Sequence, residues 1–379
     1  MSNDINSNRR LFLGTAAVAV AATLLLAVIF AVVSAARGDA VTLNDNPRPK
    51  MTHAAVGILV EGELRSLGAA TAWLNSGQLT AADLRGKVVA IEFWTYSCIN
   101  WMRALPYTRA WADKYSDQGL VVIGVHAPEF GFEKDLDNVR RAATDMRVDY
   151  PIAVDNDFAI WSAFNNAYWP ALYLVDAKGR VRYRHFGEGD YDKSERMIQQ
   201  LLREAGNAAV DREVVSINGR GVEAAADWGS LRSPENYLGY NRTQNFASPG
   251  RMTSDTRRTY VAPASLRLNS WGLVGDWTAG SAAVMLNGAN GRIVYRFRAR
   301  DLHLVMGPAK RGTSVRFRVL IDGRAPGAAH GIDVDEQGNG AADVQRMYQL
   351  IRQPKPIVDR VFEIEFLDAG IEAFSFTFG

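Results

Sequence analysis

The feature that most constrains the fold is a regular alternation of strand-like and helix-like segments between residues 58 and 206. It opens with a βαβ unit, in which an apolar strand at 87–93 is followed by helical apolar spacing at 98–115 and by a second apolar strand at 120–126. The later segments are helices at 135–146, 158–164 and 194–205, a strand at 150–154, and a hairpin of 171–176 with 181–185. This alternation predicts an α/β domain around a mixed sheet.

The sequence pattern changes after Gly206. Residues 207–236 are typical of a linker, and from Tyr237 onward short β runs are separated by turn residues. The clearest runs are 293–297, 302–306, 315–321, 362–367 and 374–378. Polar and apolar residues alternate in several of them, as in strands with one wet face. We therefore predict a β-sandwich or jelly roll over residues 237–379, folded separately from residues 58–206.

The N-terminal region contains a long uncharged segment. The 26 residues from Leu11 to Ala36 carry no charge, and a helix of that length can span a bilayer. Because Arg9 and Arg10 precede it, we predict a single-pass anchor within residues 1–37, a tether at 38–57, and domains on the periplasmic side of a bacterial inner membrane. The segment fits a twin-arginine signal and an ordinary anchor equally well, and its length favours retention over cleavage.

Charge and cysteine content exclude several classes of function. Lys and Arg outnumber Asp and Glu by only 43 to 41, which gives no electrostatic footprint for nucleic acid. Cys98 is the single cysteine, so an intramolecular disulfide framework and a cysteine-only zinc site are excluded. The five histidines lack metal-ligand spacing. We expect no bound metal and no other cofactor.

Cys98 stands where the helix of the βαβ unit begins. A helix N-terminus presents free N–H groups and a partial positive charge, which stabilise a thiolate and can lower a cysteine pKa to about 7. The position therefore predicts a reactive thiol. The alternative is that a lone cysteine is a small buried apolar residue.

Three features around Cys98 have the placement found in thioredoxins. Glu92 lies six residues before Cys98, Pro106 lies eight residues after it, and Trp169-Pro170 precedes a later strand. This part of the chain resembles a thioredoxin. Longer motifs are similar to the extracytoplasmic thioredoxin-like module and the carbohydrate-binding-like β domain of DipZ-type cytochrome c biogenesis proteins, among them LRGKVV at 84–89, GVHAPEF at 124–130, ARDLHLVM at 299–306 and FTFG at 376–379.

The resemblance implies disulfide exchange at Cys98, with Pro170 as a cis-proline that faces the thiol and exposes a backbone edge for a substrate peptide. It also implies that Glu92 is the buried acid that assists deprotonation of a second cysteine. That second cysteine is absent, because Trp101 occupies its place. Release of a mixed disulfide would then need an outside thiol. For Glu92, a structural role bound to water or Lys87 is the alternative.

Other residues have two interpretations. Trp94, Tyr96 and Trp101 form either an apolar platform around the thiol or ordinary packing. We expect His126 to be a hydrogen-bonded structural histidine.

In the β domain, Trp271 and Trp277 either stack on sugar rings or fill the core. Residues 333–340 superficially resemble a calcium loop but lack its downstream acidic ligand, so a turn rich in Asp and Gly is expected.

Two functions from different classes follow. The leading hypothesis is a membrane-tethered thiol-disulfide oxidoreductase with a degenerate Cys-x-x-Trp site, which acts on extracytoplasmic protein disulfides with an external thiol. The alternative is a redox-inactive module that binds extracytoplasmic proteins or glycans while Trp101 blocks turnover. A peroxidase is disfavoured, because the proline upstream of the peroxiredoxin Thr-x-x-Cys spacing would fall at Ile91.

Overall fold

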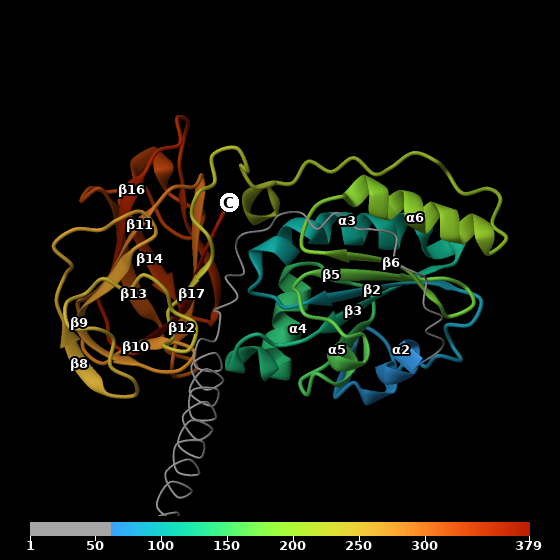
Figure 1. Ribbon diagram of the computed structural model, residues 1–379, viewed down its shortest axis with the longest axis horizontal. Coiled ribbons are helices and arrows are strands. Elements are labelled where there is room, and N and C mark those ends of the chain that lie inside the picture. The colour runs from blue at the N-terminus through green and yellow to red at the C-terminus, as the bar shows by residue number, and fades with distance from the viewer. Residues whose placement is uncertain (1–61) are drawn as a thin grey trace, which may run out of the picture. The chain divides into compact units, whose positions relative to one another are not determined.

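The computed structural model describes residues 62–379. The predicted anchor at 1–37 and tether at 38–57 lie outside these residues. Within residues 62–379, none of the helices has the length and apolar character needed to cross a membrane. All the described residues fall in one compact unit, with α/β structure in its first half and β structure in its second (Figure 1).

The first half is built on a six-stranded sheet with the strand order β1-β4-β3-β2-β5-β6. β2 (Val88–Trp94) is parallel to β3 (Leu120–His126) and antiparallel to β5 (Ala171–Val175). All seven residues of β2 are buried, as expected for a strand with both faces covered. The other strands are β1 (Ala72–Leu74), β4 (Ile152–Val154) and β6 (Val181–Phe186).

Helices cover both faces of this sheet. α3 (Ile99–Tyr115) and α6 (Tyr191–Glu204) lie on one face, and α2 (Gly62–Arg65) and α5 (Ala159–Ala163) lie on the other (Figure 1). α4 (Leu136–Asp145) packs into the same apolar cluster as α3. The predicted α/β alternation is confirmed. The short elements α2 and β1 are absent from the prediction because three or four residues are too few to show a period.

The second half is all β, as predicted. Its sheet follows β14-β13-β16-β11-β9-β10-β17-β12-β15, with β7 and β8 paired at the side. The strands are β7 (Asn236–Tyr237), β8 (Arg257–Tyr260), β9 (Trp271–Ala279), β10 (Val284–Leu286), β11 (Gly291–Phe297), β12 (Asp301–Pro308), β13 (Val315–Ile321), β14 (Asn339–Ala342), β15 (Arg346–Arg352), β16 (Arg360–Phe366) and β17 (Ile371–Phe378).

β9 connects two parts of this sheet, because its first half pairs with β11 and its second half pairs with β10. Aromatic rings from the two parts meet in the core, where Tyr295 of β11 lies 5.0 Å from Phe376 of β17. The sheet therefore folds back on itself around one apolar core. Trp271 and Trp277 belong to that core and are fully buried, which leaves neither ring free to stack on a sugar.

The segment 207–236 is fastened to the helices of the α/β domain. Lys114 and Gln199 both donate hydrogen bonds to the carbonyl of Glu213. The backbone N–H of Val215 donates to the buried carboxylate of Glu195 at 2.8 Å. The first part of the predicted linker thus follows α3 and α6. Independent folding of the two domains stays a prediction.

Arg103 of α3 connects the two halves of the described structure. Its side chain is buried and forms an ion pair with Glu188 at 2.9 Å. The same guanidinium donates to the carbonyl of Phe378 in β17 at 3.3 Å. Met347 and Phe374 of the β domain also pack into the apolar cluster that contains α3. The helix that starts at Cys98 is therefore held by both domains.

Candidate functional site

Cys98 is the N-cap residue of α3, directly after the turn that follows β2. Its backbone is extended, with φ of −80° and ψ of 112°, and its carbonyl accepts the N–H of Met102 at 3.0 Å. The side chain is half-buried. The structure thus places the thiol at the helix start that the sequence predicts.

The thiol faces the segment around Pro170. The Trp169–Pro170 peptide bond is cis, as the resemblance implies. The Cys98 thiol donates to the carbonyl of Trp169 with a sulfur–oxygen distance of 3.9 Å. The Trp169 indole donates in turn to the carbonyl of Ala127 at 3.0 Å. Segments that lie far apart in the sequence therefore meet at the thiol. The backbone of Trp169 forms an edge beside the nucleophile.

The surroundings of the Cys98 thiol oppose the effect of the helix N-terminus on its pKa. Burial raises the pKa of the thiol, and the carboxylates of Glu129 and Glu235 raise it further. The backbone N–H groups of Trp101 and Asn100 act in the opposite direction but do not outweigh these effects. At neutral pH the thiol is therefore held in its protonated form.

Trp101 points into the core of the α/β domain. Its side chain is fully buried, and its ring is stacked on Trp94 with centroids 4.3 Å apart and planes 25° apart. Its Nε1 donates to Glu92 Oε2 at 3.2 Å. Tyr96 is buried as well. These three aromatic residues are packing elements behind the thiol and do not form an exposed platform.

Glu92 collects three hydrogen bonds in the core. Besides Trp101, its carboxylate accepts from the hydroxyl of Thr108 at 2.8 Å and from that of Tyr150 at 3.2 Å. Its partners are thus core side chains, whereas Lys87 is exposed. Burial raises the pKa of Glu92 to about 7, although the three hydrogen bonds lower it. The carboxyl group can therefore gain or lose a proton near neutral pH.

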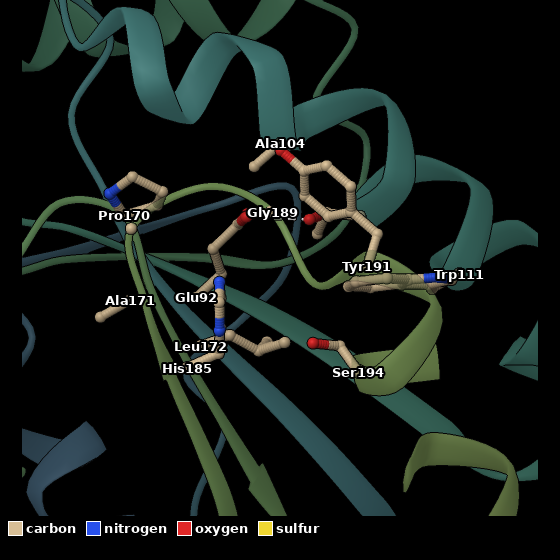
Figure 2. Close-up of a pocket in the computed structure, with 12 residues that line it drawn as sticks. Glu92, Ala104, Trp111, Pro170, Ala171, Leu172, His185, Gly189, Tyr191 and Ser194 are labelled. Atoms are coloured by element: carbon tan, nitrogen blue, oxygen red, sulfur yellow. Dashed lines mark hydrogen bonds between the residues drawn. The ribbon is translucent and has the colours of Figure 1, made fainter. Parts of the chain in front are cut away.

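A small pocket lies beside Glu92. It is lined by residues of α3, β5 and α6 and by Pro170. Figure 2 shows the Glu92 side chain, Pro170 and the ring of Tyr191 around it. Two of the predicted site residues, Glu92 and Pro170, therefore line the same pocket.

His126 differs from its prediction. It is fully buried at the end of β3, and its ring is stacked on Tyr96 with centroids 5.8 Å apart. Neither ring nitrogen has a hydrogen-bond partner within residues 62–379. Burial lowers the pKa of His126 to about 3, so the ring is neutral. The buried, neutral ring fits the expected structural role, but the expected hydrogen bonds are absent among the described residues, because aromatic rings surround the imidazole.

Glu133 is a buried residue of the site that the sequence analysis missed. Its carboxylate accepts from the Ser97 hydroxyl at 2.6 Å and from the backbone N–H groups of Glu129 and Phe130 at 2.7 and 2.9 Å. Burial raises the pKa of Glu133 to about 7. Glu133 lies three residues after Phe130, the N-cap of a short 3-10 helix at Gly131–Lys134, and reaches back to the Phe130 N–H. Because the N-cap is not Ser, Thr, Asp or Asn, the sequence lacks the usual signal for such a contact.

The residues 62–379 contain no group of three or more His, Cys, Asp or Glu side chains placed to hold a metal ion. In the Asp-rich segment of the β domain, Asp335 accepts the backbone N–H of Asn339 at 2.8 Å. The side chain of Asp333 pairs with Arg346 at 2.7 Å. This segment is a hydrogen-bonded turn, as expected.

Comparisons with known proteins agree with this architecture. A family model described as the AhpC/TSA family matches residues 69–184, and a model for a thioredoxin-like C-terminal domain matches residues 233–379. Protein DipZ of Mycobacterium tuberculosis is 38% identical over 258 residues, which cover 67% of this chain and 36% of DipZ. The chain thus spans about a third of the length of that relative.

A smaller relative is matched over nearly its whole length. Thiol-disulfide oxidoreductase YkuV of Bacillus subtilis is 36% identical over 134 residues, which cover 35% of this chain and 89% of YkuV. Among solved structures, a thioredoxin-like protein in its oxidized form is 35% identical and covers 35% of this chain and 90% of its own, with a TM-score of 0.33.

The first prediction concerns the ionisation of Cys98. Because burial and two carboxylates oppose the thiolate, iodoacetamide should alkylate folded Cys98 more slowly near neutral pH than the same cysteine in urea. The rate for the folded protein should still rise above about pH 9, where the unfolded reference levels off. A midpoint at or below that of the unfolded reference would show that the helix N-terminus dominates.

The second prediction concerns Glu92 and stability. Between about pH 4.5 and 7 the folded state keeps a proton on Glu92 that the unfolded state has lost, so the free energy of unfolding falls as pH rises through this window. Glu92 should contribute roughly 3 kcal/mol to this decrease in the free energy of unfolding, at about 1.4 kcal/mol per pKa unit.

Glu92→Gln should remove this part of the decline, as measured by urea unfolding near pH 5 and pH 7.5. Asp137→Asn, at an exposed ion pair, is the control and should leave the decline unchanged. A decline in Glu92→Gln as steep as that of the wild type would contradict the assignment.

Proposed function

Since the chain belongs to the family of thioredoxin-like thiol-disulfide oxidoreductases, we propose that it exchanges disulfides through Cys98 alone, with an external thiol completing the cycle. The observation that supports this is the position of Trp101, which is buried, stacked on Trp94 and hydrogen-bonded to Glu92. Residue 101 is therefore a fixed part of the core. No second thiol is available in the chain.

The proposed reaction has three exchange steps. The Cys98 thiolate attacks one sulfur of a substrate disulfide, the substrate S–S bond breaks, a Cys98–substrate disulfide forms, and the other substrate sulfur leaves as a thiolate that takes up a proton. An external thiolate then attacks this mixed disulfide and regenerates Cys98. The substrate sulfur ends in a disulfide with the external thiol, and a second external thiol releases it by the same exchange.

The backbone at Trp169 supplies the binding edge in this proposal. Its carbonyl lies 3.9 Å from the Cys98 sulfur, so an extended peptide paired along this edge would bring its own disulfide next to the thiol. We propose extracytoplasmic proteins as the source of these disulfides. The raised pKa of Cys98 makes the attack slow at neutral pH, because only the thiolate reacts.

A second candidate function is a redox-inactive recognition module. It is favoured by the protonated, half-buried thiol and by the indole in place of the second cysteine. In that case the edge beside Pro170 binds an extended segment of a partner protein without covalent chemistry. We propose no glycan site, because the tryptophans considered for it are buried in the β core.

The third prediction separates these two functions. Wild-type protein should form long-lived mixed disulfides at Cys98, which mass spectrometry detects, and should reduce insulin only weakly without an external thiol. Cys98→Ser should abolish both. Trp101→Cys should raise insulin reduction by at least about tenfold, because a neighbouring thiol acts at a large effective concentration and Glu92 is placed to accept its proton.

Trp101→Ala is the matched control, because it opens the same space without adding a thiol. Loss of a buried tryptophan destabilises a core by about 3 to 5 kcal/mol, so both variants are checked for folding by circular dichroism. If wild-type Cys98 forms no adduct and Trp101→Cys gains no more activity than Trp101→Ala, the recognition module is the function.

The fourth prediction concerns location. We propose that residues 11–36 tether the protein to the membrane with the two domains outside the cytoplasm, on the basis of the uncharged segment after Arg9 and Arg10. The full chain should stay in the membrane fraction after an alkaline carbonate wash and should be digested by protease added to spheroplasts. Recovery of a shortened, soluble chain would contradict the tether, and protection from the protease would contradict the orientation.

A further inference from the structure

The loop after β3 connects the thiol to the β domain. At the start of this loop, the carbonyl of Ala127 holds the indole of Trp169 at 3.0 Å, and the carbonyl of Trp169 accepts the Cys98 thiol at 3.9 Å. The loop continues to Phe130, which packs against Phe374 of β17 with ring centroids 5.1 Å apart. A displacement of this loop would therefore move the Trp169 side chain, and with it the carbonyl that accepts the Cys98 thiol.

Glu129 of this loop is bound by two residues of the β domain. Its Oε1 accepts from the hydroxyl of Tyr237 at 2.5 Å and is paired with Arg242 at 3.0 Å. The Arg242 guanidinium also lies over the Tyr237 ring, with its central carbon 3.2 Å from the ring centroid. The Glu129 side chain is 9% exposed, so its charge is poorly screened by water. The β domain thus supplies the counter-charge for a carboxylate of the α/β domain.

This carboxylate acts on the thiol. Apart from burial, Glu129 is the first charged group that raises the pKa of Cys98, and Glu235 is the second. Burial and Glu129 raise the pKa of Glu235 itself to about 8, while Tyr237 and Arg242 lower it. The positive charge that partly neutralises Glu129 is that of Arg242, while the backbone N–H groups of Trp101 and Asn100 face the sulfur from α3. Whatever neutralises Glu129 therefore favours the thiolate.

We propose that Arg242 and Tyr237 are positioning residues of the thiol site, which set the reactivity of Cys98 by holding and neutralising Glu129. The β domain then contributes two residues that control the reactivity of the thiol. This inference rests on the proposed function only in taking Cys98 as the reacting group. It predicts that substitutions in the β domain change thiol chemistry in a direction fixed by the charge that they remove.

The fifth prediction tests the direction of these changes. The midpoint of the pH profile of Cys98 alkylation by neutral iodoacetamide is measured on the full chain and its variants. Glu129→Gln should lower the midpoint, because it removes a negative charge near the sulfur. Arg242→Gln should raise it, because Glu129 is left without its counter-charge. Each shift should be about half a pH unit, which is about threefold in thiolate at a fixed pH below the midpoint.

Two further variants separate this effect from loss of structure. Tyr237→Phe keeps the ring beneath Arg242 but removes the donated hydroxyl, so it should also raise the midpoint. Arg311→Gln is the matched control, because Arg311 of the β domain pairs with Asp135 of the α/β domain at 3.1 Å in an exposed position. It should leave the midpoint unchanged.

Opposite shifts for Glu129→Gln and Arg242→Gln, both beyond that of Arg311→Gln, support the proposal. Equal midpoints, or shifts of both variants in the same direction, overturn it. Alkylation requires no disulfide exchange. Opposite shifts in a protein that forms no mixed disulfide would therefore refute the proposed function and leave this inference standing.

Discussion

The hydrogen bond from Trp101 to Glu92 is the interaction on which the rest of the site depends. A carboxylate in an apolar core is stable only if donors surround it, and Glu92 has three. The indole supplies one of them and fills the space behind the thiol by stacking on Trp94. The bond ties the first turn of α3 to β2, and that turn holds Cys98 at its start. An indole in this position takes part in packing, whereas a cysteine there would give its proton to Glu92.

The electrostatics of the thiol follow from what surrounds it. A helix N-terminus favours a thiolate, and the N–H groups of Trp101 and Asn100 do act in this direction. Burial opposes them, and so do two carboxylates that belong to other parts of the fold. The neutral thiol then finds a partner in the carbonyl of Trp169. The reactivity of Cys98 is therefore controlled by groups outside the Cys-x-x-Trp motif.

The β domain is joined to the α/β domain by polar contacts as well as apolar packing. Arg103 is buried and is bound from both sides, by Glu188 and by the carbonyl of Phe378. A buried guanidinium without these partners would be strongly destabilising, so this contact favours one arrangement of the two domains. The contact of Arg242 with Glu129 adds a second link near the thiol. The two domains thus share the surroundings of Cys98.

The sequence by itself determined the α/β alternation of the first half, the all-β character of the second half, the start of α3 at Cys98 and the absence of a second thiol. These features follow from local periodicity and from the identity of single residues, which contacts elsewhere do not change. Only the tertiary structure decided that Trp101 points inward, that Tyr150 reaches Glu92 across 58 residues, and that Glu129, which raises the pKa of Cys98, is paired with Arg242. A pKa or a hydrogen bond depends on distances between segments that lie far apart in the chain, and periodicity along the chain carries no information about those distances.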